Sequence, residues 1–227
     1  METKDLFDHY QNLACKADEA FRKVEKEYPS CVKCRVQCSD CCHAVFGVFA
    51  IEAAVLKKKF DSLPRKARKS ALLSADSADR ELRKIEIRMQ MSDDDPHMKG
   101  MVLAKARVAC PLLSQSQECI LYHDRPITCR VYGIPTAIQG KGHVCGKGAF
   151  EKGRKYPTFD LDAVYGSLYN LSREYLKRTG NQDSEAASLL LSVSRVIKGP
   201  MRETETGAKK DKPLKPHSRA LTTKRQV

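Results

Sequence analysis

Five cysteines fall within twelve residues of this sequence, at Cys31, Cys34, Cys38, Cys41 and Cys42. Thiols at this density can form disulfides, bind structural zinc, hold an iron–sulfur cluster or act as a reactive pair. Neighbouring side chains point in different directions on a strand or a helix, so Cys41 and Cys42 are poorly placed to chelate one ion together. We therefore expect one of the two to serve a second site.

Four further cysteines lie much later in the chain, at Cys110, Cys119, Cys129 and Cys145. Pro111 follows the first of these four and Gly146 follows the last, and both residue types suit tight turns that bring backbone amides towards thiolate sulfurs. Eight thiols, four near and four far, can fill two tetrahedral sites, or one cluster and one ion.

The start of the chain, METKDLFDHY, lacks the basic and then apolar pattern of a signal peptide. No apolar run approaches the roughly 20 residues that a membrane span requires. We therefore expect a cytoplasmic protein with no membrane partner. Thiols are kept reduced in the cytosol, so we expect its ten cysteines to bind metal or take part in redox chemistry rather than form stable disulfides.

The order of the cysteine segments carries a specific resemblance. CRVQCSDCC, then FAIEA, CPLL, CILYHDRPITCRVYG and a later cysteine resemble the YkgJ-type family, the zinc- or iron-chelating CxxCxxCC domain. The similar region runs from about Cys34 to Cys145. The sequence departs from the family pattern in its additional thiol, Cys31, and in the three residues between Cys34 and Cys38, so either Cys31 or Cys34 can be the ligand.

The resemblance implies a ligand set and two further motif residues. The implied metal ligands are Cys34, Cys38, Cys41, Cys42, Cys110, Cys119, Cys129 and Cys145. Arg125 and Arg130 match the family's RP..CR motif. They can bind an anionic substrate or cofactor, or they can hydrogen-bond thiolates or carboxylates and so offset cluster charge, which we favour. Glu52 is a candidate carboxylate partner for them, or simply a polar position on the helix that follows the cysteines.

Some larger members of this family resemble flagellin lysine N-methylases that use S-adenosylmethionine, and the spacing of Cys34, Cys38 and Cys41 coincides with that of the radical S-adenosylmethionine cluster motif. The resemblance therefore implies a second hypothesis, a protein lysine N-methyltransferase that uses the cluster. No glycine-rich nucleotide loop and no repeated βα units accompany the motif, so this hypothesis stays second.

Other residues able to do chemistry have simpler interpretations. Cys15 lies off the apolar stripe of the first expected helix, and we interpret it as an incidental thiol. His43 and His143 flank ligand candidates but lack zinc-finger spacing, so we assign them positions outside the metal's direct ligands or on the surface. We expect Tyr122 to pack rather than to act as a catalytic acid.

The formal charge of +13 could indicate a nucleic-acid partner. However, residues 199–227 carry eight Lys or Arg against three acidic residues, and residues 57–90 carry eleven against five. We predict that the first segment is a disordered basic tail and that the second is the solvated side of a helix. Few aromatic residues accompany the basic ones, so nucleic acid is disfavoured, and a nucleic-acid-associated zinc module is a third option only.

Apolar spacing of three or four residues predicts helices over 6–28, 51–60, 72–89, 161–178 and 185–197, with Gly180 stopping the fourth. The segment AVFGVFA before the second helix could form a brief strand, and SDDDPHMKG reads as a loop after the third. The three aspartates of that loop could bind a cation, although a solvated turn is the favoured interpretation. The stretch 110–148 is irregular, so a metal site should organise it.

These patterns predict a small, mainly α, single domain of about five helices with minimal β structure. Residues 1–198 form the cysteine-cluster domain, with its motif core at 31–148, and residues 199–227 form the tail. The predicted function is metal binding through an iron–sulfur cluster, zinc or both. A protein partner is left open. We favour the iron–sulfur cluster, because several irons in one cage tolerate the closely spaced Cys34, Cys38 and Cys41.

Overall fold

The computed structural model describes residues 3–91, 96–181 and 185–199. Its α-helices are α1 (Lys4–Glu27), α2 (Ala50–Asp61), α3 (Arg65–Gln90), α4 (Pro96–Lys105), α5 (Ile127–Val131), α6 (Leu161–Arg178) and α7 (Val193–Lys198). Three short 3-10 helices, η1 (Asp40–His43), η2 (Tyr122–Asp124) and η3 (Glu185–Ala187), and three strands complete the elements. The predicted mainly α fold is confirmed.

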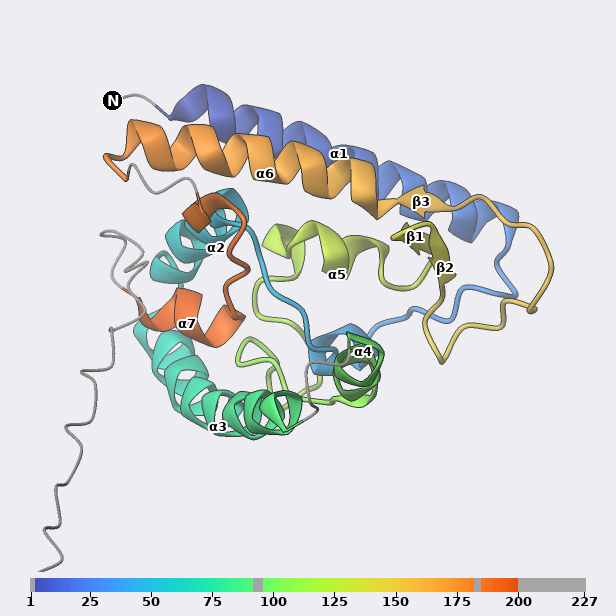
Figure 1. The fold of residues 1–227 in the computed structure, drawn as a ribbon, viewed down its shortest axis with the longest axis horizontal. Helices are drawn as coiled ribbons and strands as arrows, with labels where there is room; N and C mark the ends of the chain where they lie inside the picture. The colour runs from blue at the N-terminus through green and yellow to red at the C-terminus, as the bar shows by residue number, and fades with distance from the viewer. Residues whose placement is uncertain (1–2, 92–95, 182–184, 200–227) are drawn as a thin grey trace, which may run out of the picture.

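Helices α1 and α6 lie side by side along one edge of the molecule and cover α5 (Figure 1). The buried stripe of α1, which includes Leu6, Tyr10 and Ala14, packs in one core cluster with Leu161 and Leu168 of α6. Buried apolar side chains at this spacing are what drive an amphipathic helix onto its neighbour. These two long helices thus share one core cluster with Ile127 and Val131 of α5, the helix that carries Cys129.

Both ends of α6 lie where the sequence predicts them. The side chain of Asp160 accepts a hydrogen bond from the backbone N–H of Ala163 (3.0 Å) and so caps the first turn. After the last turn, Gly180 adopts a φ of 91°, a left-handed conformation that glycine takes without steric cost. The predicted helix over 161–178 and its glycine stop are confirmed.

Helices α2, α3 and α7 pack around a second core cluster that includes Leu56, Phe60 and Ala75. The start of α2 is fixed by Glu52, whose carboxylate accepts backbone N–H bonds from Phe49 (3.2 Å) and from Ile127 at the start of α5 (3.0 Å). One buried side chain therefore joins the beginnings of two helices.

A small sheet borders the cysteine segments. Strand β1 (Thr136–Ile138) pairs antiparallel with β2 (Lys141–His143) and parallel with the two residues of β3 (Phe159–Asp160). The segment after the first cysteines is extended but forms only isolated bridges, Ala44 with Arg107 and Val48 with Leu191. The brief strand expected there is therefore present only as single bridges.

Two sequence-based predictions differ from the structure. The continuous helix predicted over 185–197 is wrong: Leu191 exchanges backbone hydrogen bonds with Val48, and α7 starts only after Ser192, whose hydroxyl caps it. Helix α4 occupies part of the predicted loop, because Pro96 stands at its first position, where a missing N–H costs nothing. The stretch 110–148 is less irregular than predicted, since it contains η2, α5, β1 and β2.

Two further expectations lie outside the described residues. These are the cation site of the three aspartates at 93–95 and the disordered tail, of which only residue 199 is described. Within the part of the chain that the structure covers, no helix combines the length and the apolar character needed to cross a membrane.

Candidate metal centre

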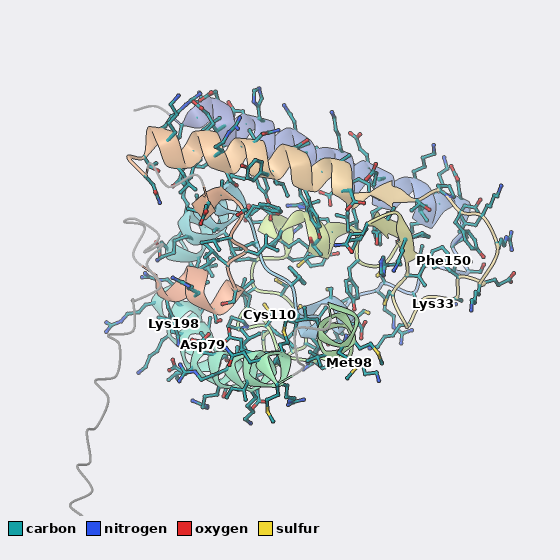
Figure 2. All side chains as sticks on the ribbon, viewed as in Figure 1. Lys33, Asp79, Met98, Cys110, Phe150 and Lys198 are labelled. Carbon is teal, nitrogen blue, oxygen red and sulfur yellow. The ribbon has the colours of Figure 1, made fainter. Side chains whose placement is uncertain are left out.

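All ten cysteines are free thiols, and the eight predicted ligands lie between α1 and α6, in loops, in η1 and in α5. Cys110 is labelled in Figure 2, and it packs with Cys119 against the core cluster of α2, α3 and α7. The backbone N–H of Cys110 bonds the carbonyl of Cys42 (2.7 Å), and that of Val108 bonds the carbonyl of His43 (3.0 Å). These bonds place the distal segment alongside the proximal one.

Five thiols form what we call the inner group: Cys41, Cys42, Cys110, Cys119 and Cys129. Cys42 is central, because its thiol hydrogen-bonds both Cys119 and Cys41. The hydrogen bond from Cys42 lowers the pKa of Cys41 to about 7 and also lowers that of Cys119. Burial raises the pKa of Cys110 to about 12, and burial together with the neighbouring thiolates raises that of Cys129.

Three thiols form the outer group: Cys34, Cys38 and Cys145. Cys34 is exposed at the surface, and the partial burial of its thiol, followed by the nearby thiolates of Cys38, Cys145 and Cys41, raises its pKa to about 12. The Cys34 sulfur rests on Gly133, where an added Cβ would lie 2.1 Å from it, so this close approach requires glycine. The thiol of Cys145 is buried and donates a hydrogen bond to Asp40 Oδ2 (3.4 Å).

The remaining cysteines lie apart from these contacts. Cys15 is exposed on α1, where Gln11 donates to its sulfur (3.8 Å). Cys31 is buried, and its thiol lies 4.0 Å from the Ser30 hydroxyl. Its carbonyl accepts a hydrogen bond from the Ala149 N–H (2.9 Å), which closes the whole cysteine region into a loop.

The two candidate histidines differ in their surroundings. His43 lies in η1 directly after Cys42, and its Nδ1 hydrogen-bonds the carbonyl of Ser39 (2.9 Å). His143 is exposed on β2. These positions agree with the interpretation that His143 is a surface residue and that the His43 ring is held by the backbone.

Arg130 is buried, and its guanidinium donates hydrogen bonds to three acceptors. Its guanidinium donates to Asp18 Oδ2, to the carbonyl of Arg125 (2.9 Å) and to that of His123 (2.6 Å). The carboxylate that it meets is therefore Asp18 and not Glu52, whose oxygens take the two backbone N–H groups described above. Sequence reasoning missed Asp18 because it lies on α1, far from the motif.

Arg125 is placed differently. Its guanidinium stacks on the exposed ring of Tyr122 (3.9 Å to the centroid), and its buried Nε has no hydrogen-bond partner. Its nearest carboxylate oxygen, on Asp18, lies 3.9 Å away. Tyr122 thus packs, as expected, but on the surface, against a cation. The positive charge lowers the pKa of thiols in both groups, among them Cys34 and Cys119, although other effects dominate there.

As they stand, no three His, Cys, Asp or Glu side chains among residues 3–91, 96–181 and 185–199 converge closely enough to hold one ion. The eight predicted ligands are gathered into two groups rather than into finished sites. The donor set fits a soft metal, because all eight predicted ligands are thiols, the donors that zinc and iron–sulfur clusters take.

A mainly helical domain that encloses two groups of reduced thiols belongs to the class of thiolate metal-binding domains. A comparison with protein families agrees: the model of the CxxCxxCC family, described as a putative zinc- or iron-chelating domain, matches residues 33–146, half of the chain. The chain is a member of this family. Neither a curated protein nor a solved structure matches it.

Proposed function

We propose that this protein binds an iron–sulfur cluster, zinc or both through eight cysteines of the two thiol groups. The ligands are Cys34, Cys38, Cys41, Cys42, Cys110, Cys119, Cys129 and Cys145. The observation that carries the proposal is the pair of backbone hydrogen bonds from Cys110 to Cys42 and from Val108 to His43, which holds the distal cysteine segment against the proximal one. Membership of a zinc- or iron-chelating family supports the general function.

The division of the thiols supports two sites rather than one. Cys42 contacts the distal Cys119, and Cys110 lies nearby, whereas Cys34 has Cys38 and Cys145 as neighbours. Zinc sites and iron–sulfur clusters each need about four thiolates. Cys42, Cys110, Cys119 and Cys129 supply four in the inner group. Cys41, which also neighbours Cys34, makes a second set of four with Cys34, Cys38 and Cys145.

The chain's own residues prepare the sites in two ways. Backbone bonds between residues 42–43 and 108–110 hold the proximal and distal segments together. Arg125 adds a partly buried positive charge, which offsets the negative charge that accumulates when several thiols ionise. A bound cluster would supply one-electron chemistry, and zinc would supply a structural cross-link.

Purification of the full chain without oxygen tests the proposal. A brown sample with iron and acid-labile sulfide supports a cluster, and a colourless folded sample with stoichiometric zinc supports zinc alone. Cys119→Ser and Cys129→Ser should each lower metal content and thermal stability, whereas the control Cys15→Ser should change neither. A purified chain that takes up neither iron nor zinc would contradict the proposal.

The S-adenosylmethionine hypothesis stays second, since no feature of the residues that the structure describes adds to it. Calorimetric titration of the metal-loaded protein with S-adenosylmethionine separates the two hypotheses. Saturable binding in the micromolar range would favour the methyltransferase, and no heat of binding would favour metal binding alone.

A further inference from the structure

A groove runs along one face of α3, away from the thiol groups. Its volume is about 790 Å³, within the range of pockets that hold drug-sized ligands. The α3 residues that line it, from Asp79 to Met89, recur mainly at three- or four-residue steps and so share one side of the helix. The other walls are the extended segment 45–47 and residues 190–192, together with part of α7.

The groove combines exposed apolar side chains with open backbone. Leu82 and Leu190 line it, and Leu190 is 54 % exposed although its side chain is large and apolar. Among the described residues, Phe46 and Gly47 have no backbone hydrogen-bond partner, because the two isolated bridges of this segment lie on either side of them. Apolar side chains beside an unpaired strand edge are the arrangement that accepts an extended peptide segment.

The chain itself reaches the groove at the end of α7. Gly199 lines the groove and leaves the helix in an extended conformation, with a φ of −64° and a ψ of 145°. The proline that follows it cannot continue the helix. Lys198 and Asp79, which are labelled next to one another in Figure 2, form an ion pair (2.6 Å) at this end of the groove. Residues 200–227 therefore start from within the groove lining.

Length and chemistry favour the first residues of this continuation as the occupant. The α3 wall rises about 15 Å, which about five extended residues span. The next five residues are PMRET, at 200–204. Met201 offers a flexible apolar side chain that adapts to an irregular lining. The arginine and the glutamate that follow it can meet opposite charges on the groove, at Glu86 and Arg83.

We propose that residues 200–204 occupy this groove as an extended segment that pairs with the backbone of Phe46 and Gly47. A segment joined directly to its site has an effective concentration in the millimolar range, so it fills the groove ahead of a free partner or a second copy. The wall at 45–47 follows Cys42 and His43 closely, so the docked segment braces the chain that leaves the proximal cysteines. The inference does not depend on metal binding, and it limits the predicted disordered tail to the residues beyond 204.

Photocrosslinking in the full chain tests the proposal. The photoreactive amino acid p-benzoylphenylalanine, placed at Met201, should form an intramolecular crosslink that mass spectrometry maps to 45–47, 79–89 or 189–192. The same amino acid at Leu221, further along the sequence, should give an about fivefold lower yield of this crosslink. Leu190→Glu puts a charge into the groove and should lower the yield from position 201 about fivefold. Leu73→Glu is the matched control, because Leu73 is an exposed leucine of α3 outside the groove lining, and it should leave the yield unchanged.

Three results would overturn the proposal: crosslinks from position 201 that map outside the groove, equal yields at positions 201 and 221, or crosslinks that join isotope-labelled to unlabelled copies of the chain. The last would mean that the groove holds a second copy. If circular dichroism shows that Leu190→Glu fails to fold, the comparison of the two crosslinker positions decides alone. None of these measurements depends on metal content, so failure of the proposed metal-binding function would leave their outcome unaffected.

Discussion

At the scale of single residues, two ion pairs tie the cysteine segments to distant parts of the chain: Arg130 pairs with Asp18 of α1, and Arg107 pairs with Asp40. The family resemblance implies eight thiol ligands, and the adjacency of Cys41 and Cys42 leads us to expect that one of the two serves a second site. Both stay predictions of the cysteine pattern. It could not predict the partners of Arg130 or Asp40, because Asp18 and Arg107 are brought to them only by the packing of distant segments.

Arg125 is the residue where charge should matter most to metal binding. Arg125→Gln removes a partly buried cation whose charge acts on thiols of both groups, so we expect about tenfold weaker metal affinity, within the range known for residues that support metal ligands. Competition with a colorimetric chelator measures the change. Arg154→Gln is the matched control, because Arg154 also lies over a tyrosine, Tyr156, but pairs with the exposed Glu151. Equal affinities in the two variants would exclude this role for Arg125.

At the scale of elements, the spacing of apolar residues predicted the long helices correctly. It gave the wrong element where a backbone pairing or a helix-starting proline decided the local structure. The buried stripes of α1 and α6 repeat regularly and were predicted with nearly correct ends. Ala186, Leu190 and Val193 also follow at three- or four-residue steps, yet Leu191 pairs with Val48 as extended chain. Helix α4 was missed because proline and glycine within ten residues indicate a loop, although a proline at the first position of a helix is well tolerated.

The junction of α2 and α5 gives a prediction about stability. Glu52→Gln leaves one oxygen to accept two backbone N–H groups, from Phe49 and Ile127, so one buried donor loses its partner. We expect the free energy of unfolding to fall by about 1–3 kcal/mol. Denaturant titration of the metal-loaded protein measures it. A stability equal to that of the wild type would show that the carboxylate does not hold the two helices together.

The same carboxyl gives a pH dependence. Burial raises the pKa of Glu52 to about 7 from the ordinary value of 4.5. Between these pH values the folded protein retains a proton that the unfolded chain releases, so this group stabilises the fold at low pH, and that contribution is lost as the pH rises through 7. Glu52→Gln should therefore flatten the decline in stability between pH 5 and pH 8. An unchanged slope would assign the decline to other groups.

At the scale of the whole molecule, the fold divides into a helical frame and a thiol-bearing interior. Removal of the metal by a chelator should lower the local stability of these two parts unequally, because metal binding stabilises mainly the segments that carry the ligands. We expect faster backbone hydrogen exchange over residues 31–43 and 106–148 of the chelated protein, and little change in α1 and α6. Uniform protection with and without metal would mean that the interior is organised by packing alone.

The closure of the cysteine region by the Cys31–Ala149 hydrogen bond has a consequence for biosynthesis. Helix α1 leaves the ribosome first, yet the helix that lies beside it, α6, begins more than a hundred residues later. At 5–20 residues per second, this delay is on the order of ten seconds. The thiols of both groups are translated within this interval, and all of them precede α6 in the chain. We therefore expect metal to enter most rapidly on the nascent chain, before α6 packs against α1, so that a shortage of metal during translation would not be fully repaired afterwards.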